Sequence, residues 1–438
     1  MNRRTIAKQI FLAGVESVLP DRLIANVMAI KDNILLIGSL KLSLEVIDKI
    51  YVIGAGKACA MMASEIENIL GSRITEGHIT VKYGHSVKLK YINVSEAGHP
   101  VPDSNGFKAT KAILEIAGKA NRNDLVICLL SGGGSALLPD FPEGSSPEEM
   151  ISLNILLINS GACIKEINAV RKHLSIVKGG QLARAVCPAT LVSLILSDVP
   201  GDPLDVIASG PTTPDPTTFQ QAIAVLEKFN LAKSVPMTIL NFLREGEKGD
   251  KPETPKTGDL VFKKTHNILI GTNRLALEAA KKKALELNIN TVIVEDQLQG
   301  DISTVAEYIV ETALKFKSDE SAVKPFCLLF GGETTVKMTG KGLGGRNQHL
   351  TLLASNLLQN HKGITILSAG TDGNDGPTDV AGAVVDSDTV PKAMLKNINP
   401  ERYIREFDSY HFFKKAGGQI ITGPTMTNVM DIIVVIVD

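Results

Sequence analysis

Two glycine-rich loops hold the residues of this 438-residue chain that are best suited to bind an anion. The loops read GAGK at 54–57 and SGGGS at 131–135, and each follows a short apolar run. Glycines lack a Cβ, so backbone N–H groups can converge on an anion, and a lysine at a helix N-terminus adds a positive charge. The loops predict a phosphate or carboxylate site. A tight turn with a solvated Lys57, and a flexible turn at 131–135, stay open as alternatives.

A third glycine-rich loop, GKGLGGRN at 340–347, leads into a predicted helix with a basic residue. It resembles the Walker A loop only loosely, because Arg346 and Asn347 stand where that motif has lysine and serine or threonine. Arg346 could still bind a carboxylate or phosphate through two parallel hydrogen bonds. The alternative is a surface loop whose arginine faces water.

Acidic residues follow two other apolar runs. Asp198 and Asp202 lie in the segment SDVPGD, and Asp372 and Asp375 lie in the segment TDGNDG. Carboxylates at the ends of strands commonly hold Mg²⁺ or orient a hydroxyl group. Aspartate is also frequent in ordinary turns, so that interpretation stays open beside the functional one.

Other catalytic motifs are incomplete. Cys59 replaces the third glycine of the dinucleotide pattern GxGxxG, and Lys57 intrudes into it. The segment GGSAL at 133–137 lacks the last glycine of the serine-hydrolase pattern GxSxG. The histidines form no HExxH motif, the five cysteines form no CxxC pair, and His99 beside Pro100 is more typical of a structural residue than of a base. These absences weigh against a dinucleotide enzyme, a serine hydrolase and a zinc site.

Composition narrows the class further. The chain has 46 basic and 47 acidic residues, and this near balance argues against nucleic-acid or membrane-surface binding. Hydrophobic residues make up 44% and charged residues 21%, as in globular proteins. Five cysteines without a paired spacing fit a reducing compartment, and no apolar run is long enough to span a membrane. We therefore expect a cytoplasmic protein that acts on neither nucleic acid nor membrane.

Apolar runs alternate with helical patterns, which predicts an α/β fold. An amphipathic helix is expected around Phe11 and Val15, and another over 275–287. The charged, proline-containing segment 245–259 is typical of a surface loop or hinge, and we place a domain boundary near residue 240. The continuous apolar runs, which suit buried strands, are 50–53, 125–130, 191–196, 268–270, 326–330, 364–367 and 432–437.

Taken in order, these motifs resemble the glycerate 2-kinases of the MOFRL type, a family long labelled hydroxypyruvate reductases. The resemblance covers nearly the whole chain. It departs from the family pattern at Cys163, at His349 where relatives have glutamate, and at Met426 where relatives read GPTGTN. The matching segments include GAGKA at 54–58, GHPVPD at 98–103, SGGGSALL at 131–138, SDVPGDPLDVIASGPTTPD at 197–215, GGETTV at 331–336, GLGGRNQ at 342–348, SAGTDGNDGPTDVAGAVVD at 368–386 and TGPTMTNVMD at 422–431.

The resemblance implies two three-layer α/β/α domains. Residues 1–240 would form a Rossmann-like domain with a parallel sheet, and residues 241–438 a MOFRL domain with a mixed sheet, with the active site in the cleft between them. The implied reaction is ATP-dependent phosphorylation of the C2 hydroxyl of D-glycerate, which gives 2-phosphoglycerate and ADP and requires Mg²⁺. A homodimer is the default expectation, because closed symmetric dimers are common.

The resemblance also assigns site residues. Family members have an active-site lysine at the position of Lys57 and an arginine at that of Arg346, and we expect Asp198 to be catalytic beside them. Asp198 and Asp202 are the expected metal ligands. The residues expected to bind substrate or phosphate are Gly56, Ser131, Gly132, Gly133, Gly134, Ser135, Glu333, Asn347 and Asp372.

Two rival functions stay open. An NAD(P)H-dependent hydroxypyruvate reductase would explain the incomplete GxGxxG pattern, and a regulator that binds a sugar phosphate or nucleotide without turnover would use the same glycine loops. The residues do not identify the loop that holds adenine, and they do not fix the acceptor beyond glycerate.

Overall fold

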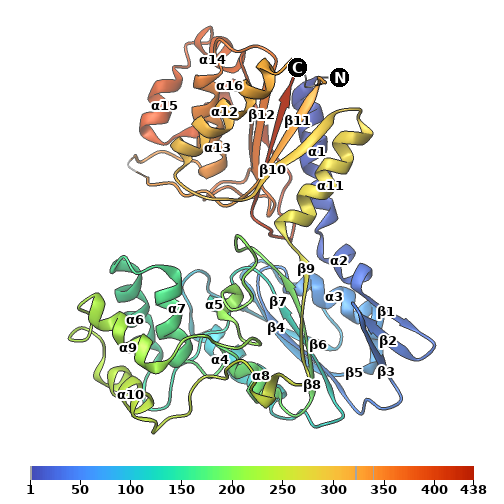
Figure 1. Cartoon of the computed structure of the whole chain (residues 1–438), viewed down its shortest axis with the longest axis vertical. Helices are drawn as coiled ribbons and strands as arrows, with labels where there is room; N and C mark the ends of the chain where they lie inside the picture. The colour runs from blue at the N-terminus through green and yellow to red at the C-terminus, as the bar shows by residue number, and fades with distance from the viewer. Residues whose placement is uncertain (1, 321–322, 339) are drawn as a thin grey trace. The chain divides into compact units, whose positions relative to one another are not determined.

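The structure is a computed structural model that describes residues 2–320, 323–338 and 340–438 (Figure 1). The chain divides into two compact units that interleave in the sequence, and each is described by itself. The N-terminal unit comprises Pro20–Leu196 and Pro203–Ile270, and the C-terminal unit comprises Met1–Leu19, Ser197–Asp202 and Gly271–Asp438. The predicted bounds of 1–240 and 241–438 stay a prediction.

A six-stranded sheet forms the centre of the N-terminal unit, in the order β6-β5-β4-β7-β8-β9. β4 pairs in parallel with both β5 and β7, and every residue of β4 and β7 is buried, as the continuous apolar runs predict. The sixth strand lies beyond residue 240 in the sequence. The bounds are β4 (Ile50–Ala55), β5 (Ile74–Lys82), β6 (Ile92–Ala97), β7 (Leu125–Leu130), β8 (Thr190–Leu196) and β9 (Thr265–Gly271).

Helices cover both faces of this sheet, which confirms the predicted layered architecture (Figure 1). One face carries α3 (Cys59–Leu70), against which α2 (Pro20–Val27) packs, and the other carries α4 (Ser104–Ala117), α5 (Gly134–Leu137) and α8 (Gln181–Val186). A small antiparallel sheet joins α2 to the main sheet. Its strands are β1 (Met28–Lys31), β2 (Ile34–Ile37) and β3 (Leu40–Ser43).

Four further helices of the N-terminal unit pack around a second hydrophobic core, in which Leu153, Leu226 and Leu243 are buried. The segment expected to be a loop from residue 245 begins as helix, because α10 continues to Lys248 on the strength of its buried face. The helices are α6 (Pro147–Asn159), α7 (Ile164–His173), α9 (Phe219–Lys228) and α10 (Met237–Lys248).

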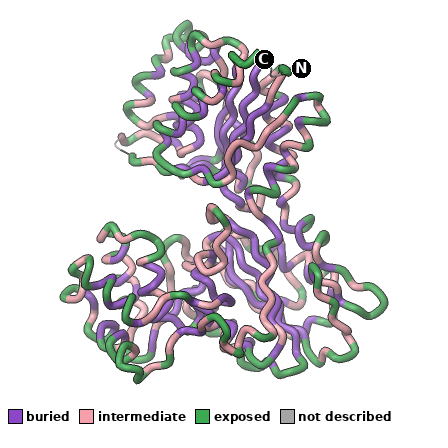
Figure 2. Tube along the Cα trace, in the orientation of Figure 1, coloured by how far each residue is buried: buried purple, intermediate pink, exposed green. Residues whose placement is uncertain are grey.

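The C-terminal unit contains a mixed sheet in the order β10-β11-β15-β12-β13-β14, as predicted. β10 and β11 are parallel, and the remaining neighbours are antiparallel. β15 is wholly buried (Figure 2), because both of its faces are covered. The strands are β10 (Asn290–Leu298), β11 (Phe326–Gly332), β12 (Ile364–Gly370), β13 (Gly382–Asp386), β14 (Gln419–Ile420) and β15 (Asp431–Val437).

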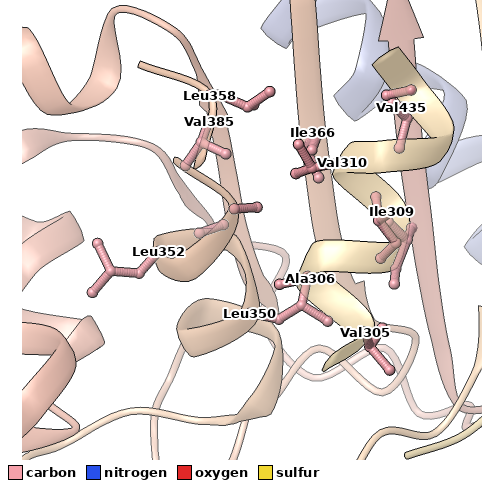
Figure 3. Close-up of a cluster of buried hydrophobic side chains, with 14 of the residues drawn as sticks. Val305, Ala306, Ile309, Val310, Leu350, Leu352, Leu358, Ile366, Val385 and Val435 are labelled. Atoms are coloured by element: carbon pink, nitrogen blue, oxygen red, sulfur yellow. The ribbon is translucent and has the colours of Figure 1, made fainter. Parts of the chain in front are cut away.

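One face of the mixed sheet packs against α1 (Arg3–Ser17) and α11 (Asn273–Glu286). The opposite face packs against α12 (Ile302–Ser318) and α13 (Arg346–Leu357), and Figure 3 shows Ile309 and Leu350 from these helices in the same apolar cluster as Val435 of β15. Three short helices complete the unit: α14 (Thr389–Met394), α15 (Pro400–Glu406) and α16 (Ser409–Ala416). Among the described residues, no helix is both long enough and apolar enough to cross a membrane.

Candidate active site

The first two glycine-rich loops meet at the carboxyl ends of neighbouring strands in the N-terminal unit. β4 and β7 are parallel neighbours, so the residues that follow them emerge at the same edge of the sheet. Lys57 N donates to Gly132 O at 2.9 Å, and Ala58 N donates to Ser131 Oγ at 3.1 Å. The structure therefore brings Gly56 and Lys57 together with the SGGGS segment, which were expected to bind the same anionic groups.

The contact between Gly56 and Ser131 needs a glycine. Gly56 has a φ of +147°, and a Cβ there would lie 2.1 Å from Ser131 Oγ. Ser131 is buried, and its hydroxyl also lies 3.5 Å from Cys59 Sγ. Ser131 Oγ thus holds the two loops together, while its expected role in phosphate binding stays a prediction.

Gly56→Ala is expected to destabilise the protein through this contact. The clash and the positive φ should together lower the free energy of unfolding by about 2–4 kcal/mol, as urea denaturation would measure. Gly249→Ala is the control, because Gly249 has a φ of +88° in the left-handed region but a Cβ added there would have no atom within 4 Å, so it should lose only about 1 kcal/mol. Equal losses in the two variants would contradict the close-contact explanation.

The remainder of the SGGGS segment packs against a strained loop at residues 208–210, which sequence reasoning did not predict. A Cβ on Gly134 would lie 2.9 Å from the Cβ of Ala208, and Ser135 Oγ lies 2.9 Å from Ser209 Oγ. Ala208, Ser209 and Gly210 have φ values of 50°, 62° and 62°, and Ser209 Oγ donates to Asn168 Oδ1 at 3.2 Å. Consecutive left-handed residues with side chains are uncommon and cluster at functional sites.

Lys57 is the cation of this cluster. In the part of the chain that the structure describes, its ammonium group makes neither an ion pair nor a side-chain hydrogen bond, so it can accept an anionic ligand. Burial lowers the pKa of His99 to about 4, and the positive charges of Lys57, Lys82 and His85 act in the same direction. His99 is therefore neutral at neutral pH, and it lies directly behind Gly133.

Arg346 is the centre of a second cluster, in the C-terminal unit. It is the first residue of α13, and its guanidinium binds Asp431 in bidentate fashion, with Nε to Oδ2 at 2.6 Å and Nη2 to Oδ1 at 3.0 Å. Nη1 donates to Glu333 Oε1 at 2.6 Å. Burial disfavours the charged guanidinium, but the charge and hydrogen bonds of Asp431 and the charge of Glu333 outweigh that effect and raise the pKa of Arg346. These three bonds leave two of the five N–H donors of an arginine for a ligand.

The strand directions explain why these acids meet. Glu333 follows β11, and Asp431 begins β15, which is antiparallel to β11. The carboxyl end of one strand and the amino end of the other therefore lie at the same edge of the sheet. Sequence reasoning missed Asp431. An acid immediately before the terminal apolar run at 432–437 was the available signal.

Asp375 fixes the start of α13, beside Arg346. Its buried carboxylate accepts the backbone N–H groups of Asn347 and Gln348 at 3.0 and 2.9 Å, and the side-chain amides of the same two residues at 3.3 and 3.0 Å. Burial raises the pKa of Asp375 to about 6, and these hydrogen bonds partly offset that rise. The amide of Asn347 is thus engaged in structure, and its expected contact with substrate stays a prediction.

The remaining predicted acids lie on loops of the same unit. Asp198 Oδ2 lies 3.4 Å from Asn428 Nδ2, and Asp372 Oδ1 accepts the backbone N–H of Asn374 at 3.1 Å. Asp202 has a φ of 53°, and its Oδ1 is buried without a hydrogen-bond partner. Burial raises the pKa of Asp202. Over residues 2–320, 323–338 and 340–438, no group of three or more histidine, cysteine or acidic side chains is placed to hold a metal.

His349, one of the departures from the family pattern, is a buried residue of α13. Its ring stacks on Phe407 with centroids 4.3 Å apart, and burial lowers the pKa of His349 to about 4. Below pH 6.5 the unfolded chain takes up a proton that the folded chain does not, so stability falls as the pH drops from about 6.5 to 4.

Replacement of this histidine should flatten the pH dependence of stability. His349→Gln should reduce the fall in the free energy of unfolding between pH 7 and pH 5 by about 2 kcal/mol, as urea denaturation at each pH would show. His361→Gln, a change to a partly exposed histidine, is the control. An unchanged slope in His349→Gln would contradict this role of its burial.

Met426 is a second departure from the family pattern. It has a φ of 61°, in the left-handed region that favours glycine, at the position where the family pattern has glycine. Cys163 precedes α7, and its side chain is exposed.

Comparison with known proteins identifies the family of this chain. The model of the "Domain of unknown function (DUF4147)" matches residues 6–244, and that of the MOFRL family matches residues 326–431. The chain is 42% identical to the D-glycerate 2-kinase of Thermotoga maritima, over 98% of this chain and 97% of that protein, and 40% identical to the glycerate 2-kinase of Pyrococcus horikoshii, over 100% and 98%. A crystal structure of a glycerate kinase from Thermotoga maritima aligns with a TM-score of 0.88 at 39% identity and covers 99% of each chain. The chain belongs to the MOFRL-type glycerate 2-kinase family, as its motifs predict.

Proposed function

We propose that this enzyme transfers the γ-phosphoryl group of ATP to the C2 hydroxyl of D-glycerate, which gives 2-phosphoglycerate and ADP. The observation that carries the proposal is the arrangement at Lys57, whose unpaired ammonium lies on a loop joined to SGGGS. It is supported by full-length similarity to proteins named D-glycerate 2-kinase and glycerate 2-kinase.

Phosphoryl transfer depends mainly on positioning and on neutralisation of charge, and the two clusters supply both. Lys57 and the free N–H groups of the glycine loops would bind phosphate oxygens in the N-terminal unit. Arg346, held by Asp431 and Glu333, would direct its two remaining N–H donors at the carboxylate of glycerate or at the transferred phosphoryl group.

The residues at 197–202 fit the Mg²⁺ that kinases of this type need. Asp202 Oδ1 is a buried oxygen without a hydrogen-bond partner, which is a group that a divalent cation would satisfy. Asp198 and Asp202 would hold the ion, with phosphate oxygens as further ligands. When bound, the ion neutralises charge on the nucleotide phosphates.

The proposal is tested by ADP release from Mg-ATP with D-glycerate, with the product resolved by phosphorus NMR. We expect release that depends on glycerate and formation of 2-phosphoglycerate. Formation of 3-phosphoglycerate would keep the kinase and refute the position of transfer. Absence of ADP, together with NADH oxidation by hydroxypyruvate in a parallel sample, would favour the reductase instead.

A further inference from the structure

A pocket of about 290 Å³ opens beside the SGGGS segment, within the N-terminal unit. Gly133 and Ser135 form part of its wall, together with His99 from the preceding loop. α6 forms another part of the wall, to which it contributes Ile155 and Ile158. The pocket therefore combines a glycine-rich, polar side with an apolar side.

The apolar side is unusual because α6 has hydrophobic residues on two faces. Leu153 and Leu157 are buried in the core of the helical cluster, which accounts for one face. Ile155 and Ile158 lie on the pocket side and are 54% and 61% exposed. Ile151 lines the same wall, so the three isoleucines follow the i, i+4, i+7 spacing of one helix face. Apolar side chains that gather around a concave surface mark a site for a ligand with an apolar face.

The pocket also contains a positive charge without a counter-charge. Arg171 lines it, and its Nε donates to Asn154 Oδ1 at 2.6 Å. Among the described residues, no carboxylate lies within ion-pair distance of Arg171, and burial lowers its pKa without any opposing acid. The other cation of the pocket, Lys178, is neutralised by Asp140 at 3.2 Å. A half-buried guanidinium without an acidic partner favours an anionic ligand.

The two features together select one substrate of the proposed reaction over the other. D-Glycerate has an oxygen on each of its three carbons, so it gains little from a wall of isoleucines. A nucleotide has an apolar, planar base and an anionic phosphate chain in one molecule. The pocket volume is close to the lower limit of about 300 Å³ for small-molecule sites, which is enough for a nucleoside.

We propose that this pocket binds the adenosine part of ATP, with the base against the isoleucines of α6 and the phosphate chain between Arg171 and the SGGGS segment. The proposal rests on the proposed kinase function, since it names the nucleotide subsite of that activity. It also explains why isoleucines of α6 are exposed. Anion binding by the glycine loops gives no reason for this exposure.

Ile155→Glu tests the apolar wall. The added carboxylate would put a hydrated charge against the apolar base, and the dissociation constant of ATP should rise by about tenfold or more in calorimetry without glycerate. The KM for ATP should rise in parallel, while the KM for D-glycerate should stay within about twofold. Ile164→Glu is the matched control, because Ile164 is 55% exposed on the neighbouring helix α7 and does not line the pocket.

Arg171→Gln tests the charge separately. Glutamine keeps a hydrogen-bond donor for Asn154, and we expect the dissociation constant of ATP to rise about tenfold. The control is Arg184→Gln, a half-buried arginine of the same unit that binds Gln181 and the Glu253 carbonyl. Circular dichroism and melting temperatures would show that each variant is folded.

Photolabelling locates the base in the unmodified protein. Illumination with 8-azido-ATP should label peptides from 98–107 or 147–159, and excess ATP should suppress the label. Labelling confined to other segments would overturn the proposal. So would unchanged ATP affinity in both folded variants, or an increase in the KM for glycerate alone.

The failure of the kinase proposal would look different. If the wild type bound ATP in this pocket and released no ADP with glycerate, the pocket would stand and the proposed reaction would fall. If glycerate were phosphorylated normally and neither variant weakened ATP binding, the reaction would stand and the pocket assignment would fall.

Discussion

Lys57→Met is expected to reduce kcat by about 10²- to 10⁴-fold while the protein stays as stable as the wild type. The ammonium of Lys57 makes no ion pair and no side-chain hydrogen bond in the described part of the chain, so its loss leaves no buried group without a partner. Methionine keeps a long unbranched side chain and removes only the charge. A side chain whose removal leaves stability unchanged and lowers kcat strongly is one that acts on the bound ligand.

The measurement is steady-state ADP release with saturating Mg-ATP and D-glycerate, next to urea denaturation of the same samples. Lys82→Met is the control, because Lys82 ends the neighbouring strand β5 and also contributes positive charge at His99. It should retain turnover within about threefold. Similar losses in the two variants would assign the effect to the general positive field, and full activity in Lys57→Met would refute the predicted role.

The wholly apolar strands could be predicted because their signal is local, and the predicted runs correspond to β4, β7, β8, β9, β11, β12 and β15. The apolar run at 125–130 has the same bounds as β7, and the run at 432–437 is one residue shorter than β15. Such strands are buried on both faces, so their sequences are continuously hydrophobic. The short strands β1 to β3 are only partly buried and went unpredicted, although β2 has the apolar sequence ILLI. Strands β5, β6, β13 and β14 went unpredicted as well.

The interleaving of the two units was not visible in the sequence. α1 precedes the N-terminal unit in the chain, yet it packs against α11 and β15 of the C-terminal unit. The helix itself was predicted from Phe11 and Val15, which are buried as expected. An amphipathic pattern shows that a face is buried but says nothing about which residues cover it.

The candidate site was predictable where one loop carries both glycine and charge. The segment around Lys57 shows these features in consecutive residues. The roles of Asp375 and Asp431 instead depend on their contacts with the start of α13. Asp375 lies 28 positions from its partner there and Asp431 lies 85 positions from its own, so no local pattern reveals these contacts. The left-handed conformation of Ala208 is likewise imposed by surrounding structure, because nothing in an alanine favours a positive φ.

Arg346→Ala should lower kcat by about 10³-fold or more and also cost stability, in contrast to the change at Lys57. Arg346 is the partner of Asp431, whose side chain is only 5% exposed, so the variant leaves a buried carboxylate without its counter-charge. We expect the free energy of unfolding to fall by about 1–3 kcal/mol, with the protein still folded at 25 °C. Turnover at 25 °C would therefore report the missing guanidinium and not a loss of folded enzyme.

Arg4→Ala separates the two effects. Arg4 binds Asp386 in the same unit through Nε and Nη2, both at 2.7 Å, and it contacts none of the predicted site residues. Its removal should also cost stability, though less because the Asp386 side chain is 27% exposed, and it should leave kcat within about twofold because this pair does not belong to the site. If Arg4→Ala and Arg346→Ala lost activity in proportion to stability, Arg346 would be a structural residue. Loss of turnover in Arg346→Ala alone would mean that its two remaining N–H donors act on the substrate.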